Sequence, residues 1–386
     1  MKRREWQRVR LGSYCSKIGS GSTPRGGEQV YQPEGTALIR SQNVYNGLFT
    51  TDGLAFLGEE EATQLDGVTV EKGDVLLNIT GDSVARCCQV PESMLPARVN
   101  QHVAIVRAKP DEFDSRFLKY FFISPYMQAT MLSLAGSGGT RKALTKEMIK
   151  NFNVPKPAFP IQEEIADLLS TYDDLMENNR RRMELLEESS RVLYREWFVQ
   201  LRFPGHERTS SSSVPQGWER SPLETALVLQ RGFDLPIQDR EEGGVPIYGS
   251  TGISGYHSKA KVRGPGVVTG RSGTLGEVRY INEDFWPLNT ALWTKEFRRV
   301  TPLFALFLLR SLDLKQHNGG VSVPTLDRKS VHKVEILIPP RHLLTAFDEF
   351  ASPLFEQIAN LNTQNQKLRA ARDLLLPRLM SRDLTL

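Results

Sequence analysis

Polar and basic residues gather in glycine-rich loops of the sequence, where their side chains could bind a ligand. Gly19–Arg25 combines hydroxyls, backbone N–H groups and a guanidinium, and residues 40–43 read Arg-Ser-Gln-Asn directly after an apolar pair. Arginine matches guanine O6 and N7, and glutamine or asparagine matches adenine N6 and N7. Hydroxyls and cations match phosphate. The sequence predicts nucleic-acid contacts in this half at Ser22, Thr23, Arg25, Arg40, Gln42, Asn43, Arg141 and Lys142.

The second half has a comparable polar loop from Tyr248 to His257, in which glycines alternate with serine, threonine and tyrosine. Lys259, Lys261 and Arg263 follow at alternate positions, and on a strand all three would point to one face. Like charges on one face repel unless an anion screens them, so we predict a phosphate track there. The predicted contacts in this half are Tyr248, Ser250, Thr251, His257, Lys259, Lys261 and Arg271.

Each of these loops also has a purely structural interpretation. Gly19–Arg25 fits an ordinary surface turn, and Ser41 or Asn43 could cap its own backbone. Arg141 and Lys142 fit a solvated pair, and the Gly-Arg-Ser-Gly sequence around Arg271 fits a tight hairpin turn. The sequence leaves both interpretations open.

Motifs of catalysis and cofactor binding do not occur in the sequence. It has no phosphate-binding G-x-x-x-x-G-K-[ST] loop and no dinucleotide fingerprint between a strand and a helix. It also lacks the Asn/Asp-Pro-Pro-Tyr/Phe tetrapeptide of adenine-methylating enzymes. Its 3 cysteines and 6 histidines show no zinc-ligand spacing. We therefore expect a non-catalytic chain that binds no metal or cofactor, works in the reducing cytoplasm and does not enter a membrane.

Two segments have the apolar period of long amphipathic helices. After Pro160 no glycine or proline occurs up to Phe198, which predicts a helix of about 57 Å; the second helix, from Leu343 to about Leu376, is about 50 Å long. The expected apolar seams are Ile161, Ile165, Leu168, Tyr172, Leu175, Leu186, Leu193 and Trp197 in the first and Phe347, Phe350, Leu354, Leu361, Leu368 and Leu375 in the second. Asn179 and Asn365 fall on or near these seams, where an asparagine can fix the register of a coiled coil.

The two halves of the chain look like copies of one another. An offset of 182 residues carries Leu144 onto Leu326 and Leu193 onto Leu375, together with the proline-bearing segments before both helices. An offset of 192 carries the strand candidate at 74–79 onto the one that begins at Gly266. Asn100–Ala104 also parallels Asn289–Trp293, and an aromatic helix follows each. The predicted order is a globular block at 1–157, a long helix at 158–200, a linker at 201–214, a globular block at 215–340 and a long helix at 341–386.

Charge follows the same division. The net charge is +4 at residues 1–160, −5 at 161–200, +4 at 201–340 and +1 at 341–386. Positive charge therefore lies in the globular blocks, as a phosphate-binding surface requires. The acidic central helix is better suited to a spacer or a protein-docking surface.

This arrangement resembles the DNA-specificity subunit of type I restriction-modification systems. The resemblance rests on Gly21-Ser-Thr-Pro24, Leu38–Asn43, Lys72–Leu77, Pro246–Gly252, Gly270–Gly273 and Pro160–Ile165, in that setting of duplication and long helices. It implies an α+β fold with two β-rich target recognition domains, two antiparallel coiled-coil helices between them and a pseudo-twofold repeat. It also implies a subunit-docking or spacer role for the helices. The residues for that role are Gln162, Glu163, Leu168, Tyr172, Leu175, Leu186, Phe350, Leu354, Leu361 and Leu368.

By the same resemblance the chain recognises a double-stranded DNA target split by a gap. Two methylation subunits and the restriction subunits are its implied partners, and they would bind S-adenosylmethionine, ATP and Mg²⁺. Two alternatives stay open on sequence grounds. One is a structural coiled-coil adaptor with protein-binding globular ends, and the other is the specificity part of an enzyme with its own methyltransferase activity.

Overall fold

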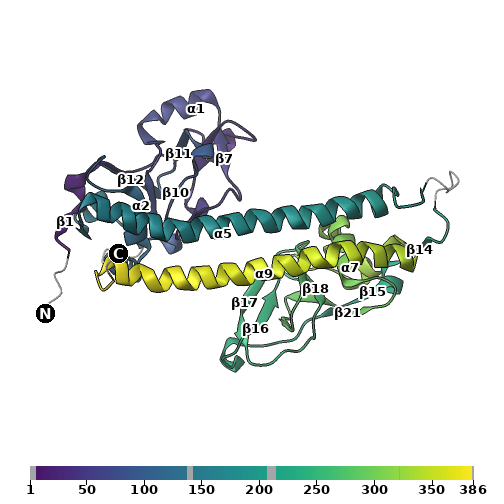
Figure 1. Cartoon of the computed structure of the whole chain (residues 1–386). Coiled ribbons are helices and arrows are strands. Elements are labelled where there is room, and N and C mark those ends of the chain that lie inside the picture. Colours follow the sequence, from purple (N-terminus) through teal and green to yellow (C-terminus); the bar gives the residue numbers. More distant parts are fainter. Residues whose placement is uncertain (1–5, 137–141, 207–213, 321, 385–386) are drawn as a thin grey trace. The chain divides into compact units, whose positions relative to one another are not determined.

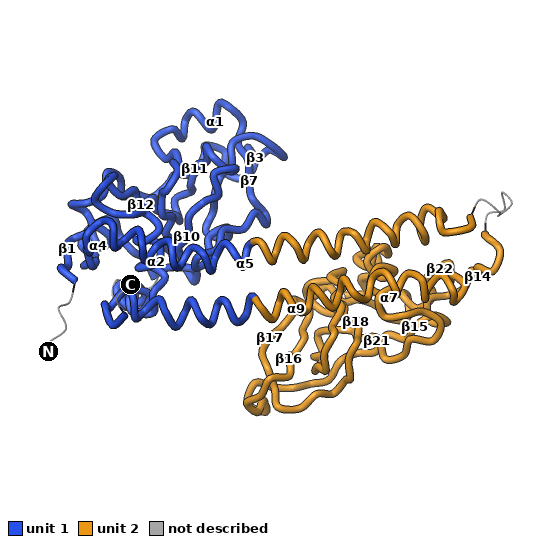
Figure 2. Tube along the Cα trace, viewed as in Figure 1, with its two compact units in different colours: residues 1–177, 365–386 blue, residues 178–364 orange. Residues whose placement is uncertain are grey.

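The computed structural model describes residues 6–136, 142–206, 214–320 and 322–384. Two compact units divide the chain, residues 1–177 with 365–386 (unit 1) and residues 178–364 (unit 2), and Figure 2 colours them separately. Helix α5 (Phe159–Tyr194), which continues as a π-helical turn (Arg195–Val199), and helix α9 (Arg341–Met380) each supply residues to both units. The long central helix predicted from Pro160 to Phe198 and the second long helix are thus confirmed (Figure 1).

Unit 1 is built on two sheets. The first is antiparallel, in the order β10 (Cys87–Gln89), β9 (Val75–Asn78), β12 (Val103–Ala108), β2 (Cys15–Ser20). The second has the order β3 (Tyr31–Gln32), β7 (Ala55–Leu57), β4 (Thr36–Ile39), β11 (Ala97–Val99), β8 (Thr69–Val70), and its β4–β11 pair is parallel. The hairpin β5 (Val44–Tyr45) and β6 (Leu48–Phe49), the pair β1 (Arg8–Arg10) and β13 (Asn153–Pro155), and helices α1 (Glu59–Gln64), α2 (Ser115–Ile123), α3 (Pro125–Gly136) and α4 (Lys146–Lys150) complete it.

The strand predicted at 74–79 is present as β9, and both of its faces are covered. Val75 and Leu77 pack into a core with helix α2, whereas Leu76 packs into a separate core between the two sheets. Successive side chains of a strand point to opposite faces, so a strand covered on both sides has an unbroken apolar run.

Unit 2 repeats this plan in a shorter form. Its antiparallel sheet has the order β15 (Leu227–Arg231), β21 (Ala291–Phe297), β18 (Gly266–Gly270), β19 (Val278–Ile281). A second sheet contains β17 (Gly252–His257), β16 (Val245–Gly249) and β20 (Trp286–Pro287), and its β16–β20 pair is parallel. The remaining elements are the pair β14 (Glu219–Pro222) and β22 (Glu335–Ile338) and helices α6 (Leu223–Ala226), α7 (Pro302–Ser311) and α8 (Arg328–His332).

The same capping chemistry begins equivalent helices in the two units. Thr145 accepts a hydrogen bond from the backbone of α4, and Asp327 accepts one from the backbone of α8. These residues follow Leu144 and Leu326, the pair that the 182-residue offset superposes. The internal repeat read from the sequence is therefore present in the structure.

Helices α5 and α9 pack against one another inside each unit. In unit 1 the Asn365 amide donates to the Met176 carbonyl oxygen at 3.1 Å, so this asparagine does lie on the helix–helix seam. In unit 2 the rings of Tyr194 and Phe347 meet at 6.2 Å. Both contacts correspond to one antiparallel register, because each step forward in α5 is matched by one step back in α9.

The predicted apolar seam of α9 is partly wrong. Phe350 is 45% exposed, and in α5 Leu175 is 47% exposed. The buried row of α9 in unit 2 advances by four residues, through Phe347, Ala351 and Phe355. The reason is that Phe307 of α7 packs edge-on against both Phe347 and Phe355, which selects the i, i+4 row as the buried face.

Candidate nucleic-acid interface

In unit 1, loops from distant parts of the sequence meet at one end of the antiparallel sheet. Strands β2 and β9 end there and β12 begins there. The Gly21 N–H donates to the Val103 carbonyl at 2.9 Å, and the Ile79 N–H donates to the His102 carbonyl at 3.0 Å. A β-carbon on Gly21 would overlap the Val99 carbonyl oxygen, so this approach requires glycine.

Two further segments join the same end. The Asn78 amide donates to the Ser41 carbonyl at 2.8 Å, which holds the 40–43 turn against β9. The Gly81 N–H donates to the Lys142 carbonyl at 3.1 Å, which brings in the segment before α4. We call the side chains gathered here, Thr23, Gln42, Thr80, Gln101, His102 and Lys142, the strand-end edge of unit 1.

Unit 2 forms the same junction with the same backbone hydrogen bonds. Gly232 donates to the Ala291 carbonyl at 3.0 Å, Arg271 to the Thr290 carbonyl at 2.8 Å and Gly273 to the Pro324 carbonyl at 2.9 Å. The Leu288 N–H donates to the Tyr248 carbonyl at 2.8 Å, as the Asn100 N–H does to the Ile39 carbonyl at 3.0 Å in unit 1. We call the side chains gathered here, Asp234, Ser250, Thr251, Arg271, Asn289 and Thr290, the strand-end edge of unit 2.

These shared hydrogen bonds align the two units residue by residue. Val103 matches Ala291, so Gln101 matches Asn289 and His102 matches Thr290. The sequence-based alignment of Asn100 with Asn289 is therefore wrong by one residue. Ile39 matches Tyr248, so the turn at 40–43 matches the turn at 249–252. Predicted contacts in the two halves that seemed unrelated thus occupy equivalent places.

Several predicted contacts lie on or beside these edges with exposed or half-exposed side chains. Ser22, Thr23, Arg25, Gln42, Lys142 and Thr251 are exposed, and Tyr248, Ser250 and Arg271 are half-buried. Burial raises the pKa of Tyr248 to about 12, so its hydroxyl keeps its proton at neutral pH. Arg271 donates through its guanidinium to the Asn289 carbonyl at 3.2 Å, which directs it along the edge. Arg141 lies outside the described residues.

Two predicted base contacts are instead structural. Asn43 is fully buried, accepts from the Arg40 N–H at 3.0 Å and donates to the Thr50 and Asp52 carbonyls at 3.1 Å. His257 is 4% exposed, and its Nδ1 accepts from the Glu241 N–H at 3.0 Å. Both side chains hold turns together, which corrects the prediction for them.

Arg40 is also largely engaged within its own unit. Its guanidinium donates to the Gly53 carbonyl at 2.7 Å, pairs with Glu28 at 3.3 Å and lies over the Tyr31 ring. A base contact by Arg40 would have to break these interactions. Gln42, which donates to the same Gly53 carbonyl at 3.1 Å, stays exposed.

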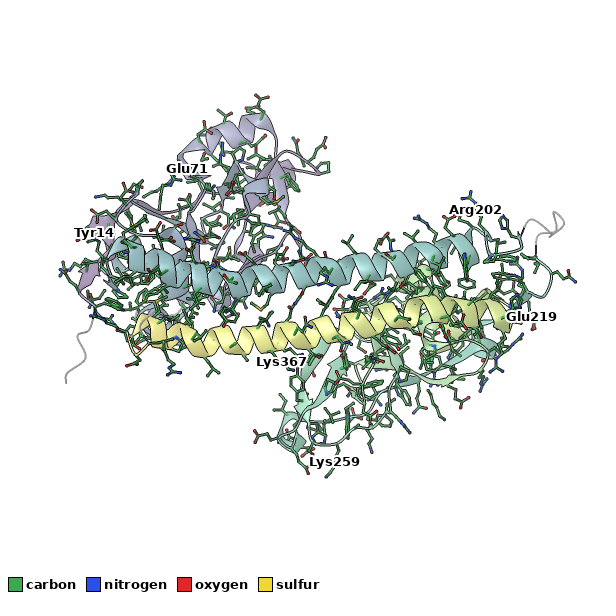
Figure 3. The ribbon with its side chains drawn as sticks, viewed as in Figure 1. Tyr14, Glu71, Arg202, Glu219, Lys259 and Lys367 are labelled. Carbon is green, nitrogen blue, oxygen red and sulfur yellow. The ribbon has the colours of Figure 1, made fainter. Side chains whose placement is uncertain are left out.

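The predicted strand carrying Lys259, Lys261 and Arg263 does not form. Strand β17 ends at His257, and Lys259 lies on an outlying loop of unit 2 (Figure 3). Lys259 pairs with Glu241 at 3.2 Å, whereas Lys261 lies over the rings of Phe233 and Trp286 at 5.7 and 5.3 Å. The two lysines have different surroundings and do not form a row, so the geometric argument for a phosphate track is wrong.

The docking or spacer residues of the long helices differ in what they touch. Gln162 is fully buried and ties α5 to the start of α2: its Oε1 accepts from the Asp114 N–H at 3.0 Å, and its Nε2 donates to the Pro157 carbonyl at 3.0 Å. It therefore holds unit 1 together and is not presented to a partner. Leu361 is buried, Leu168, Tyr172, Leu186, Leu354 and Leu368 are half-buried, and Glu163, Leu175 and Phe350 are exposed.

Gln101, His102, Asp234 and Asn289 were missed in the sequence. A signal was present for Gln101, His102 and Asn289, because Asn100–Ala104 and Asn289–Trp293 stood out as corresponding segments, but the sequence held none for Asp234. Polar residues immediately before a buried strand lie at its end, where loops of other strands meet. The two segments indicate the repeat, but only the fold shows that Gln101 lies beside Thr23 and Asn289 beside Asp234.

Comparison with known proteins places this arrangement in a family. The sequence profile of the type I restriction modification DNA specificity domain matches residues 3–188 and 216–369. The specificity subunit of the type I restriction enzyme MjaIX of Methanocaldococcus jannaschii is 25% identical over 396 residues, covering 94% of this chain and 90% of that protein. The crystal structure of the S subunit of a type I restriction-modification system from M. genitalium superposes with a TM-score of 0.58 at 17% identity, covering 98% of this chain and 97% of that one.

The chain belongs to the type I restriction modification DNA specificity domain family. Its function is therefore DNA target recognition as a specificity subunit, as the sequence predicted, and its fold is the α+β fold of that family. Specificity subunits catalyse no reaction and bind no cofactor, so the non-catalytic assignment rests on membership of the family. Neither the adaptor nor the self-sufficient methyltransferase is favoured by these findings. No helix in the described part of the chain is long and apolar enough to span a membrane.

Proposed function

We propose that each unit reads one half of a split double-stranded DNA target with its strand-end edge. The observation that carries this proposal is the repeated junction of loops, which has the same backbone hydrogen bonds in both units but different side chains. Thr23, Gln101 and His102 in unit 1 correspond to Asp234, Asn289 and Thr290 in unit 2. A shared frame with different hydrogen-bonding groups is suited to recognising two different half-sites.

Phosphate contacts follow from the charge of the two globular blocks. Residues 1–160 and 201–340, which contain these blocks, each carry a net charge of +4, and Arg25 and Lys142 are exposed at or beside the edge of unit 1. Cations at the rim of a base-reading edge attach the protein to the DNA backbone without specifying sequence. The predicted contacts on or beside the edges belong to this proposal: Ser22, Thr23, Arg25, Gln42, Lys142, Tyr248, Ser250, Thr251 and Arg271. Asn43 and His257 do not belong to it, because their side chains are buried and hold turns together.

Binding to duplexes that carry the split target tests the function, with the methylation subunits present. We expect specific binding about 10³ to 10⁷ times tighter than binding to an unrelated duplex. We also expect log Kd to change linearly with log salt concentration, because phosphate contacts release counterions. Equal affinity for both duplexes would contradict the proposal, and a salt-independent affinity would contradict the part assigned to Arg25 and Lys142.

We also propose the domain division predicted from the sequence. In this division α5 and α9 form a spacer between the two globular blocks, and the methylation subunits bind to these helices. Two methylation subunits and the restriction subunits would complete the complex in the cytoplasm and would hold its S-adenosylmethionine, ATP and Mg²⁺. Large apolar side chains exposed on the long helices support protein docking there. They are Leu175, Leu185, Phe350 and Leu374, which are 47%, 68%, 45% and 71% exposed.

Shortening both helices together tests the spacer role. Residues 178–184 of α5 and 357–363 of α9 face one another within unit 2, in the antiparallel register of Tyr194 with Phe347. Removing both heptads shortens the pair by about 10 Å, or about three base pairs of B-DNA. We expect the preferred gap to shrink by about that amount while both half-sites stay the same, as read by methylation mapping.

A deletion of one heptad alone is the matched control. It shifts one helix by seven residues against the other, which separates Asn365 or Phe347 from its partner, and we expect it to destabilise the protein. An unchanged gap after the paired deletion, with methylation retained, would contradict the spacer role.

A further inference from the structure

Gln101 and Asn289 occupy the same position in the two strand-end edges, and both carry a side-chain amide. Each directly follows the residue whose N–H bonds to the second sheet, Asn100 in unit 1 and Leu288 in unit 2. Gln101 is exposed and Asn289 is half-buried. An amide side chain therefore stands at the end of the central strands in both units.

Hydrogen bonds to neighbouring side chains fix the orientation of the Gln101 amide. Its Oε1 accepts from the Thr23 hydroxyl, and its Nε2 lies 3.0 Å from His102 Nε2, to which it donates. His102 Nδ1 lies 2.7 Å from the Thr80 hydroxyl, so this ring nitrogen is free to carry the proton and donate. The series of hydrogen bonds that links Thr23, Gln101, His102 and Thr80 thus sets which side of the Gln101 amide presents oxygen and which presents nitrogen.

Asn289 is oriented by a residue at the equivalent place, which binds the amide nitrogen where Thr23 binds the amide oxygen of Gln101. Its Nδ2 donates to Asp234 Oδ1, and Asp234 pairs with Arg231 at 3.2 Å. Asp234 lies two residues after Gly232, as Thr23 lies two residues after Gly21. Both units therefore orient an amide from the loop that follows their first sheet strand, although one uses a hydroxyl and the other a carboxylate.

We propose that Gln101 and Asn289 are the equivalent base-reading residues of the two half-sites, each contacting the major-groove edge of an adenine. After the contacts above, each amide keeps one N–H, which matches adenine N7. The Gln101 oxygen keeps one lone pair and the Asn289 oxygen keeps two, so either oxygen can accept from adenine N6–H. Thr23 and Asp234 are positioning residues that orient these amides. This inference rests on the proposed function, since it assigns particular residues of the same edges to particular bases.

Methylation mapping of the complete complex, with wild-type and variant chains, tests the inference. Gln101→Ala is expected to relax the preference at one position of one half-site by roughly 5- to 140-fold, and Asn289→Ala at one position of the other. Gln101→Glu keeps the length of the side chain but removes the donor. Because a carboxylate accepts from cytosine N4, the preference at that position should move from A·T to C·G.

Gln64→Ala and Asn282→Ala are matched controls, because both remove an exposed amide outside the strand-end edges. Gln64 is the last residue of α1, and Asn282 follows Ile281, which pairs with Gly266 at the other end of β18 from Arg271. Both should leave the motif unchanged. For the positioning role, Thr23→Ala should relax the same position as Gln101→Ala, and Thr23→Ser should restore it. A loss of stability alone would lower methylation of the whole site and would not change the preference at one position of the motif.

Binding to duplexes with single base-pair changes keeps the test decisive if a variant methylates poorly. Wild type and Gln101→Ala are compared on the adenine and non-adenine duplexes. A coupling between residue and base pair supports the contact, and additive losses overturn it. If the wild-type complex shows no split motif, the proposed function itself fails. A wild-type motif that Gln101→Ala and Asn289→Ala leave intact overturns this inference and leaves the proposed function standing.

Discussion

Exchanging the first globular block for that of a relative with a known target should change one half-site completely. The new half-site should be bound about 10³ to 10⁷ times better than the old one, which is the usual range between specific and non-specific DNA binding. The second half-site and the gap should not change, because Asp234, Asn289 and Arg271 belong to unit 2 and the long helices are kept. Methylation mapping with the hybrid chain reads all three properties at once.

The structure also shows where such an exchange should be cut. The core of unit 1 includes Ile165 and Leu169 of α5 and Leu376 and Leu379 of α9. A hybrid joined after residue 157 places a foreign block on these side chains, whereas a hybrid of residues 1–177 with 365–386 carries its own. We expect the same new half-site from both and higher stability from the second. A change in the second half-site in either hybrid would contradict independent reading by the units.

Replacing Asp173 with alanine should destabilise unit 1 by about 3–5 kcal/mol, which is the cost of breaking a buried ion pair from one side. Its Oδ2 accepts from the Tyr120 hydroxyl at 2.7 Å and from Lys119 Nζ at 3.2 Å, and its Oδ1 accepts from Arg372 at 2.6 Å. Burial raises the pKa of Tyr120, and the charge of Asp173 raises it further, so the tyrosine remains a donor. Without Asp173, Lys119 and Arg372 would be two largely buried cations near one another with no shared anion.

Asp174→Ala is the matched control, since Asp174 is exposed on the same helix turn. Hydrogen exchange resolves the two units separately. We expect faster exchange in α2 and α3 of unit 1 for Asp173→Ala, with α7 of unit 2 unchanged. Equal protection in the two variants would show that the Asp173 cluster contributes little to the attachment of α2, α5 and α9.

The repeat and its main elements could be predicted from the sequence because they depend on local patterns. The apolar run at 74–79 needs two covered faces, and the long helices have a clear period and no interior glycine. The family follows from the order of these elements together with short motifs.

The exposure of single side chains could not be predicted in the same way. Asn43 and His257 are polar residues in polar loops, and their burial depends on Thr50, Asp52 and Glu241, which reach them through the tertiary fold. Lys259 and Lys261 have the spacing of a strand, but β17 ends before them and their partners Glu241, Phe233 and Trp286 come from other segments. Phe350 has the spacing of the seam, but the position of α7 decides which row of α9 is buried.

The equivalence of Gln101 and Asn289 shows the same limit most clearly. The sequence shows that the two segments correspond to one another. It does not show which residue of one matches which residue of the other, because the long-range hydrogen bonds of Gly21 and Gly232 set that match. A one-residue error in register exchanges the side chain at a strand end for its neighbour. The candidate base-reading position therefore emerges only when the two units are aligned through their backbone contacts.

The repeated strand-end edges should let one chain read two half-sites. Mapping the modified bases in the DNA of a host that carries this chain and its methylation subunits tests it most directly. We expect one split motif, in which two specified half-sites are separated by a gap of fixed length and unspecified sequence. A continuous motif, or active methylation without any motif, would contradict it.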